Sequence, residues 1–374
     1  MHGIGSSRRL TPNRGLLYNL EVGIKSKSTN SKATQKLTAK VQPSRGAKRN
    51  LTESEITASL ADAGFHRDRP LAAPYAIKKQ RAERDQKRAA KPPKLGKVEV
   101  LRAENLQSIP WLIHGFSTRM GGVTPEYGGG ALNLGLTRED THENFERNLH
   151  LWKAAVGASQ LPLKSMRQIH SAIIHRITTV DDHPTAGDGL ITNVPGVLLA
   201  VKTADCLPVI LVDRVRKAIG VFHAGWRGTV QRIVEKGVGE MRRNFGSAPA
   251  DLLAAIGPGI GKCCYAVGDD VMDRFDSQFA YSRELFEDVF DSHALHLKYP
   301  LLFLNQRAPG HGEPAARPHL DLVKANRNQL LDAKVPDTNI SALEYCTSCR
   351  TDLFFSHRKE QVTGRMMGTV GIRS

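Results

Sequence analysis

The chain of 374 residues is predicted to contain a mixed α/β domain. Short β-branched apolar runs alternate with stretches of helical apolar spacing through residues 98–374, which is typical of α/β folds. Several neighbouring runs are joined by links short enough for hairpins, which favours mixed sheets over purely parallel ones. The excess positive charge lies almost entirely before this region. We therefore expect one globular domain preceded by a segment of a different kind.

That preceding segment is strongly basic. Residues 1–97 hold 22 Lys and Arg against 7 Asp and Glu, a net charge of +15, whereas residues 98–374 hold 31 against 30. Too few apolar residues recur in 1–97 to offset the entropy of ordering, so we expect a largely disordered extension. An Arg-rich, acid-poor start is also typical of an organellar transit peptide. Within the extension, a capping box at Thr52–Glu55 predicts a short helix to Gly64, and the basic run 77–97 indicates a linker.

The strands of the domain are predicted from short apolar runs bounded by polar or turn residues. In chain order they are Val98–Leu101, Ile113–Thr118, Ala172–Ile177, Val194–Val201, Pro208–Val212, Ala218–Phe222, Leu252–Ile256, Leu353–Phe355 and Met367–Ile372. Gly121-Gly122 are expected to break the second strand before a glycine-rich loop over 123–130. The pair of runs around residues 208–222 is the most apolar part of the chain, and we expect it to organise the rest.

The helices are predicted from apolar residues at helical spacing. In chain order they are 141–156, 230–246, 271–290 and 320–333, with Gly246 as the stop of the second. Thr185–Gly189 has turn chemistry, and residues 305–318 are predicted to form a polar Gly/Pro loop.

Composition excludes some classes of protein. No run of 18 apolar residues and no signal peptide is visible, so we expect no membrane segment. Five cysteines are an odd number for a disulfide framework and suit reduced thiols, which favours the cytoplasm. A pI near 9.8 suggests nucleic-acid binding, but the charge belongs to the extension, so we expect no nucleic-acid partner for the globular domain.

Three residues are candidates for chemistry near the central strands: His170, Cys206 and His223. Two imidazoles and a thiolate with a fourth position open would form a zinc site of the catalytic type. Alternatively, Cys206 is the nucleophile of a hydrolase, with a histidine as base and Asp205 orienting that histidine. The residue types alone do not separate the two.

Other motifs are weaker. Cys346-x-x-Cys349 suits a redox pair or half of a structural zinc site, but Cys263-Cys264 lacks the spacing of a partner pair, so we interpret these four as unpaired structural thiols. The glycine-rich loop lacks a phosphate-binding fingerprint. Three arginines, at 119, 227 and 358, are candidates to meet an anion such as phosphate.

The order of several motifs resembles the YfiH/PgeF family, long labelled multicopper polyphenol oxidase or laccase and later described as purine nucleoside phosphorylase. The resemblance covers about 110–372, and TADCLP with HAGWRG at this spacing is highly specific. The matching pieces are HGFSTRMGGV at 114–123, LNLG at 132–135, RQIH at 167–170, TADCLPV at 203–209, HAGWRG at 223–228, IGPGIGKCCY at 256–265, LDLVKANRNQLL at 320–331 and CT…FFSHR…TGRM over 346–366.

The resemblance implies a fold and a site. The fold would be a single catalytic domain of layered mixed sheets flanked by helices, grouped with cytotoxic-factor-like cysteine hydrolases. Its zinc ligands and catalytic residues would be His170, Cys206 and His223. Its substrate-binding residues would be Arg119, Asn133 and Arg227.

Two departures from the family pattern are visible. Ala266 stands where the family often carries an acid, which puts a substrate contact there in doubt. Ser348-Cys349 also departs from the usual run after CT, which favours no redox role for Cys349.

The implied activity is a zinc-dependent purine nucleoside phosphorylase for adenosine, inosine and methylthioadenosine, with adenosine deaminase activity. Its partners would be a small-molecule nucleoside and phosphate, and copper is the alternative ion. The alternatives are a cysteine-dependent hydrolase or amidase that edits peptidoglycan precursors, a copper-dependent polyphenol oxidase and, weakest, a non-enzymatic scaffold. Multicopper oxidation needs many His ligands, and the matched region has no H-x-H cluster. The sequence does not predict the oligomeric state.

Overall fold

The computed structural model describes residues 20–21, 40–41, 96–290 and 316–374. The chain divides into two units, Met1–Ala90 and Lys91–Ser374. In the first unit, strands β1 (Leu20–Glu21) and β2 (Lys40–Val41) pair antiparallel. The expected helix after Thr52 and the basic linker up to residue 95 lie outside the described residues, as does nearly all of the extension.

A six-stranded mixed sheet forms the centre of the second unit. Its order is β15 (Ile340–Ala342), β12 (Leu252–Ile256), β10 (Leu207–Asp213), β11 (Ala218–Ala224), β8 (Gly189–Thr192) and β7 (Ile174–Ile177). The pairs β12–β15 and β7–β8 are parallel and the others antiparallel. The hairpin links expected from the sequence are present, since β10 and β11 pair along their whole length.

A second mixed sheet of five strands packs face to face with the first. Its order is β3 (Val100–Leu101), β4 (Leu112–Ser117), β16 (Met366–Ile372), β9 (Leu198–Thr203) and β6 (Leu163–Lys164), and only β6–β9 is parallel. The chain passes from this sheet to the first between β9 and β10, through residues 204–206. Two further strands, β13 (Phe286–Phe290) and β14 (Ala316–Leu320), form a separate ribbon, and β5 (Met120–Thr124) bridges to Ala131.

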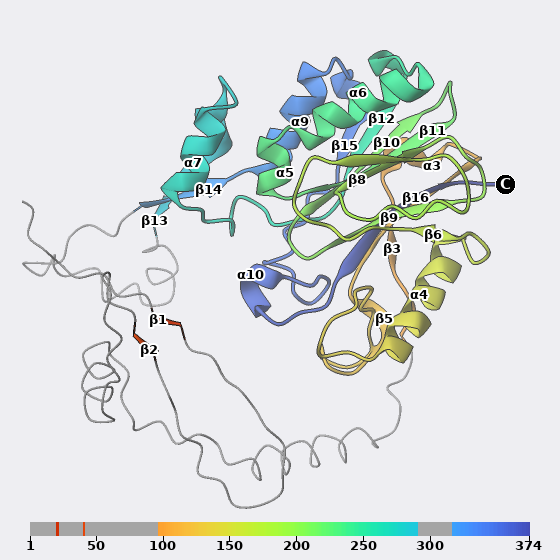
Figure 1. Cartoon of the computed structure of the whole chain (residues 1–374), viewed down its shortest axis with the longest axis horizontal. Helices are drawn as coiled ribbons and strands as arrows, with labels where there is room; N and C mark the ends of the chain where they lie inside the picture. The colour runs from red at the N-terminus through yellow and green to blue at the C-terminus, as the bar shows by residue number, and fades with distance from the viewer. Residues whose placement is uncertain (1–19, 22–39, 42–95, 291–315) are drawn as a thin grey trace, which may run out of the picture. The chain divides into compact units, whose positions relative to one another are not determined.

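Helices cover the outer face of each sheet (Figure 1). The six-stranded sheet carries α5 (Trp226–Val230), α6 (Ile233–Phe245) and α9 (Leu322–Asp332), whereas α4 (His142–Val156) packs on the five-stranded sheet. The shorter helices are α3 (Glu104–Gln107), α7 (Asp269–Asp276) and α10 (His357–Glu360), with 3-10 turns at Pro249–Asp251, Ser282–Leu285 and Asp337–Asn339. No helix in the described residues is both long and apolar enough to cross a membrane.

The apolar core consists of three parts, each between two neighbouring layers of helices or strands. Along β10, Leu207, Val209 and Leu211 face the helices, whereas Ile210 and Val212 face the second sheet. A third core around Trp152 lies between α4 and the five-stranded sheet. Because both faces of the central strands are covered, they are apolar throughout instead of alternating. The predicted mixed α/β class is confirmed, as layers of helix, sheet, sheet and helix.

Most predicted elements are confirmed with shifted ends. The helix over 141–156 begins after Thr141, whose hydroxyl accepts from the Asn144 N–H. The helix expected over 230–246 appears as α5 and α6, and α6 ends at Gly246, which takes a φ of 70°. The last helix begins two residues later than predicted because Asp321 caps it and Leu320 belongs to β14.

Four expectations are wrong, each because tertiary contacts override local pattern. The helix predicted over 271–290 ends at Asp276, since Phe286–Phe290 pairs with β14. The loop predicted over 305–318 lies outside the described residues up to 315, and its last residues belong to β14. Gly121-Gly122 lie within β5, where a Cβ on Gly122 would stand 2.2 Å from the Ala131 carbonyl oxygen. The run Leu353–Phe355 is a turn that buries both phenylalanines.

Candidate metal centre

The structure brings His170, Cys206 and His223 together. One ligand atom from each lies within 4.8 Å of the other two. The two imidazole rings meet edge to face, with centroids 4.9 Å apart. His223 is buried, Cys206 is half-buried and His170 is exposed, so the group opens to solvent on the His170 side.

Strand register explains why Cys206 and His223 meet. Pro208 pairs with His223 and Leu207 with Ala224, so one further step places Cys206 opposite Gly225. His223 stands two positions after Val221 and therefore shares its face, which lies between the two sheets. Cys206 lies at the corner where the chain changes sheet. The centre is thus at the open end of the inter-sheet layer.

Gly225 leaves the space that the centre occupies. A Cβ at this position would stand 2.7 Å from the Cys206 Sγ and 3.3 Å from the His170 Cδ2. Its φ of −78° is available to every residue, so the requirement is for space and not for backbone freedom. The glycine of the HAGWRG motif therefore has a steric reason.

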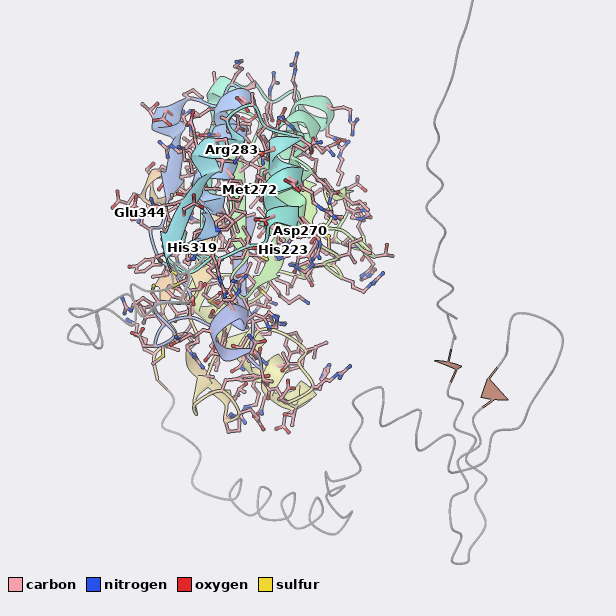
Figure 2. The ribbon with its side chains drawn as sticks, turned by 90° about the vertical axis from the view of Figure 1, so that its left-hand side faces the viewer. His223, Asp270, Met272, Arg283, His319 and Glu344 are labelled. Atoms are coloured by element: carbon pink, nitrogen blue, oxygen red, sulfur yellow. The ribbon has the colours of Figure 1, made fainter. Side chains whose placement is uncertain are left out.

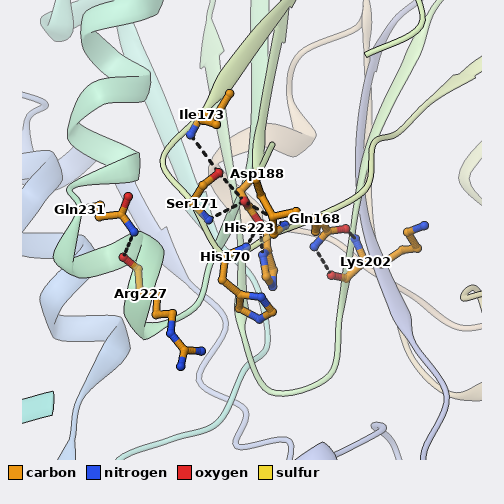
Figure 3. Close-up of polar contacts among 10 residues, drawn as sticks. Gln168, His170, Ser171, Ile173, Asp188, Lys202, His223, Arg227 and Gln231 are labelled. Carbon is orange, nitrogen blue, oxygen red and sulfur yellow. Dashed lines mark hydrogen bonds and ion pairs between the residues drawn. The ribbon is translucent and has the colours of Figure 1, made fainter. Parts of the chain in front are cut away.

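His170 reaches the centre from a loop that precedes β7. Its φ is 57°, in the left-handed region that non-glycine residues seldom adopt. The conformation is held by hydrogen bonds to one carboxylate: the His170 N–H donates to Asp188 Oδ1 at 3.1 Å, and the Ser171 N–H donates to Oδ2 at 2.6 Å (Figure 3). Gln168 anchors the loop to the second sheet through two bonds with the Lys202 backbone.

Asp188 also orients the second imidazole. It is fully buried, and its Oδ1 lies 2.8 Å from Nδ1 of His223. A carboxylate that accepts the Nδ1 proton directs Nε2 toward the other two ligands, which is the usual support of a metal-binding histidine, and metal binding would displace the Nε2 proton. One side chain thereby places two of the three candidate ligands. Figure 3 shows Asp188 between Ser171 and His223.

Asp188, Cys206 and His223 favour one another's charged forms. Burial would raise the pKa of Asp188, but hydrogen bonds from His223 and Ser171 outweigh it and lower the pKa to about 2. Burial would likewise raise the pKa of Cys206, but the charge of His223 and hydrogen bonds from both histidines lower it to about 6. Burial opposes protonation of His223, whereas the thiolate and Asp188 favour it and raise its pKa to about 9.

Asp205 does not orient a histidine, contrary to the expectation. Its Oδ1 accepts from the Thr347 hydroxyl at 2.6 Å and its Oδ2 accepts from the Arg358 N–H at 2.6 Å. Its φ of 86° turns the carboxylate away from the ligands and toward the loop after residue 345. The orienting carboxylate is Asp188 instead.

Arg119 and Asn133 lie in a separate network. The Arg119 guanidinium donates to the Thr351 and Tyr127 carbonyls and pairs with Glu360 at 2.8 Å. Asn133 is fully buried, and its side chain bonds Asp140 and the Arg365 N–H. The partners of both side chains come from loops and from the end of α10, and the candidate ligands are not among them.

Arg227 and Arg358 present charge on the side of the centre. Arg227 is exposed, its guanidinium carbon lies 4.7 Å from the centre of the Trp226 ring, and its side chain lies near His170 in Figure 3. Arg358 is exposed and lies 5.1 Å over the ring of Tyr265. Burial and the Cys206 charge raise the pKa of Tyr265, while both arginines lower it less, so the phenol keeps its proton. These three side chains and Cys206 are therefore within electrostatic reach of one another.

A Cys–His₂ donor set backed by a buried carboxylate, at the junction of two stacked sheets, defines an α/β protein with a group of side chains that could hold a metal ion. Residues 113–373 match the family described as multi-copper polyphenol oxidoreductase laccase, and the chain belongs to that family. The family resemblance stated from the motifs is thereby confirmed.

Three relatives illustrate the match. Purine nucleoside phosphorylase YlmD of Geobacillus stearothermophilus is 36% identical over 280 residues, which cover 69% of this chain and 92% of YlmD. Adenosine deaminase RL5, from an unknown prokaryotic organism, is 35% identical over 202 residues, covering 52% and 68%. The crystal structure of the hypothetical protein YfiH of Bacillus licheniformis aligns with a TM-score of 0.62 at 30% identity, over 76% of this chain and 100% of YfiH.

Sequence reasoning missed two residues of the centre. Asp188 lies within the turn predicted over Thr185–Gly189, and nothing in that pattern indicates a carboxylate that supports the centre. Tyr265 appeared only as the end of a motif. Their roles depend on pairing between distant segments, which a single sequence does not show.

Proposed function

We propose that this protein is a zinc-dependent purine nucleoside phosphorylase with adenosine deaminase activity. The observation that carries the proposal is the convergence of His170, Cys206 and His223 around one open side, with Asp188 behind them. The donor set fits zinc, which takes His and Cys ligands and keeps a position open in catalytic sites. The names of the relatives supply the two reaction classes.

The chain's own residues divide the work. A zinc ion held by His170, Cys206 and His223 would supply a Lewis acid that lowers the pKa of water, as hydrolytic removal of the adenine amino group requires. Asp188 holds His223 in the tautomer that presents Nε2 and fixes the backbone of His170. Gly225 keeps the space beside Cys206 clear.

Phosphorolysis needs an anion site beside the centre. A phosphate oxygen bonds to the ribose anomeric carbon as the bond to the purine nitrogen breaks, and the departing purine takes up a proton. We assign the phosphate to Arg227 and Arg358, which are exposed, although Nη1 of Arg358 also donates to the Ala266 carbonyl at 2.7 Å. We assign the Tyr265 hydroxyl, whose raised pKa keeps its proton in place, to donate a hydrogen bond to the departing purine, which takes its proton from water. Arg119 and Asn133 are proposed to support the substrate loop instead of touching substrate, because their polar groups are already engaged.

The test combines metal analysis with product analysis. Purified protein of known zinc and copper content is incubated with adenosine, inosine or methylthioadenosine, with and without phosphate. We expect ribose 1-phosphate or its methylthio analogue only with phosphate, and inosine from adenosine in both conditions. Absence of all these products from protein with a zinc-filled centre would overturn the proposal.

A cysteine hydrolase is the second candidate, and one observation favours it. Cys206, His223 and Asp188 follow one another as nucleophile, base and orienting acid, and the Cys206 pKa of about 6 makes a thiolate available at neutral pH. Metal-free protein distinguishes the two. A hydrolase would cleave amide substrates without metal and would lose that activity to iodoacetamide, whereas the zinc enzyme loses nucleoside turnover on removal of metal.

Copper is the alternative ion. Two imidazoles and one thiolate also suit copper, so the donor set alone does not select zinc. In the described part of the chain, the groups of three or more candidate ligands are this one and a cluster of four cysteines. A multicopper oxidase needs many more histidines, which counts against polyphenol oxidation. Copper in the purified protein with oxygen-dependent oxidation of a phenol would reverse this preference.

A further inference from the structure

Four of the five cysteines form a second cluster. Cys263, Cys264, Cys346 and Cys349 each place a sulfur within 4.8 Å of the other three. They come from two loops about 80 residues apart, one after β12 and one after β15. The expectation that Cys263-Cys264 does not partner Cys346-x-x-Cys349 is therefore wrong, because the two pairs meet in space, although all four remain free thiols as expected.

The arrangement is that of four equivalent ligands and not of two bonded pairs. The Cys349 Sγ lies 3.5 Å from that of Cys263 and 3.4 Å from that of Cys264, so it prefers neither. A disulfide needs sulfurs about 2.05 Å apart, and all four cysteines are free thiols. Four thiolates around one zinc ion, with Zn–S bonds of about 2.3 Å, stand about 3.8 Å apart in a tetrahedron. The two separations from the Cys349 sulfur are close to that figure, and all four sulfurs lie within 4.8 Å of one another.

The surrounding backbone is suited to thiolates. The Gly261 N–H donates to the Cys346 Sγ at 3.3 Å, as backbone amides do when they support charged metal-bound sulfur. A Cβ on Gly261 would stand 3.2 Å from the Cys346 Cβ and 3.3 Å from the Cys263 Sγ. The loop is therefore shaped around the sulfurs, and the space between them admits one ion and not an iron–sulfur cluster.

We propose that Cys263, Cys264, Cys346 and Cys349 bind one zinc ion in a closed tetrathiolate site. The site is structural because all four positions are filled by protein, which leaves none for substrate. It is separate from the centre at His170, Cys206 and His223, and it stands whether or not the nucleoside activity is correct.

The ion would clamp the two loops that border the active centre. Tyr265 directly follows the first cysteine pair, and Arg358, whose side chain stacks on Tyr265, follows the second loop. Between the loops, the Thr347 N–H already donates to the Gly259 carbonyl at 3.0 Å. The first loop is also held by β14, because Nδ1 of His319, which Figure 2 labels, lies 2.6 Å from the Lys262 carbonyl oxygen. The clamp therefore fixes residues that the chemistry needs without touching substrate.

The test counts ions in matched variants purified under anaerobic, reducing conditions. We expect two zinc ions per wild-type chain, and one in each of two variants: Cys263→Ser/Cys349→Ser, which removes the cluster, and Cys206→Ala, which removes the other centre. Ser348→Ala, in the same loop as two of the cysteines, is the matched control and should keep both ions.

Cobalt gives a second readout that does not depend on activity. Metal-free Cys206→Ala protein titrated with Co²⁺ should show intense thiolate charge-transfer absorption and tetrahedral visible bands that saturate at one equivalent. This measurement also covers the case in which the double serine variant does not fold. An equal zinc content in wild type and Cys263→Ser/Cys349→Ser, cobalt bands without thiolate intensity, or disulfides among the four cysteines in place of metal would each overturn the proposal.

Discussion

The two sulfur-containing clusters of this protein are built on opposite plans. The centre at His170, Cys206 and His223 stands at the ends of buried strands and draws on one thiol, whereas the cluster of four cysteines stands on loops. Hydrogen bonds and charge from the histidines lower the pKa of Cys206 to about 6. A hydrogen bond with Cys264, followed by burial, raises the pKa of Cys349 to about 11.

The two clusters differ in what stabilises the ionised form of their cysteines. In the first cluster, the charge of His223 and hydrogen bonds from both histidines favour the Cys206 thiolate without an ion, as a pair with protonated His223. In the second cluster, burial and neighbouring thiols raise the pKa of Cys263, and that of Cys349 is raised too, so binding of a cation there is coupled to release of protons. The first plan leaves a reactive open site, and the second gives a closed clamp.

The largest effect is expected from removing Cys206, the thiol of the centre at His170, Cys206 and His223. Cys206→Ala should lower nucleoside turnover by at least about 100-fold, because loss of a supporting partner alone costs about 10–100-fold. Steady-state kinetics on protein of known zinc content measures this. Val215→Ala, in the exposed turn at the far end of the same hairpin, should retain full turnover. Comparable turnover in the two variants would contradict a role for Cys206.

Asp188→Asn tests the support behind the histidines. The amide no longer selects the His223 tautomer and accepts fewer hydrogen bonds, so zinc affinity should fall about 10–100-fold. Competition with a chromophoric chelator measures the affinity. Asp213→Asn is matched in burial at the opposite end of β10 and should bind zinc as the wild type does. If both variants lose affinity equally, Asp188 acts through stability and not through the ligands.

Gly225→Ala tests the space beside Cys206. The new methyl would stand 2.7 Å from the sulfur, so we expect zinc affinity to fall by about tenfold while the tetracysteine ion is retained. Gly239→Ala is the control, because the exposed face of α6 there is open and alanine should stabilise the helix by about 1 kcal/mol. Unchanged zinc affinity in Gly225→Ala would show that the space beside Cys206 accommodates a methyl group and that Gly225 is not required there.

The last prediction concerns the acid sensitivity of folding stability, which has a source outside both clusters. Burial, then the Arg102 charge, lowers the pKa of His114 to about 4. Between pH 6.5 and 4 the unfolded chain binds this proton and the folded chain does not, so stability falls as the pH falls. The loss reaches about 3 kcal/mol below pH 4.

Denaturant unfolding of metal-free protein measures this contribution. His114→Gln should flatten the fall in stability over that pH range, whereas the exposed His150→Gln should leave it unchanged. An equally steep fall in His114→Gln would assign the acid sensitivity to the two clusters.

The sequence predicted the buried strands and the family motifs well because both are local. The run around Cys206 and His223 is apolar on both faces, and its hairpin link is short, so strand type and pairing followed directly. Asp188 and the partner of Cys346 were not predictable, because each depends on contacts between loops far apart in the chain. Phe286–Phe290 was assigned to a helix for the same reason, since only its pairing with β14 makes it a strand.

The paired register of β10 and β11 has a practical consequence. The separation of Cys206 from His223 is set by hydrogen bonds along seven paired positions and not by the link at residues 214–217, which is exposed throughout. Residues inserted into that link would lengthen the chain between the two ligands without moving either one. The turn is therefore a suitable site for inserting a peptide tag or fluorophore. A slip of one residue in the pairing, in contrast, would turn His223 to the helix-covered face and separate it from Cys206.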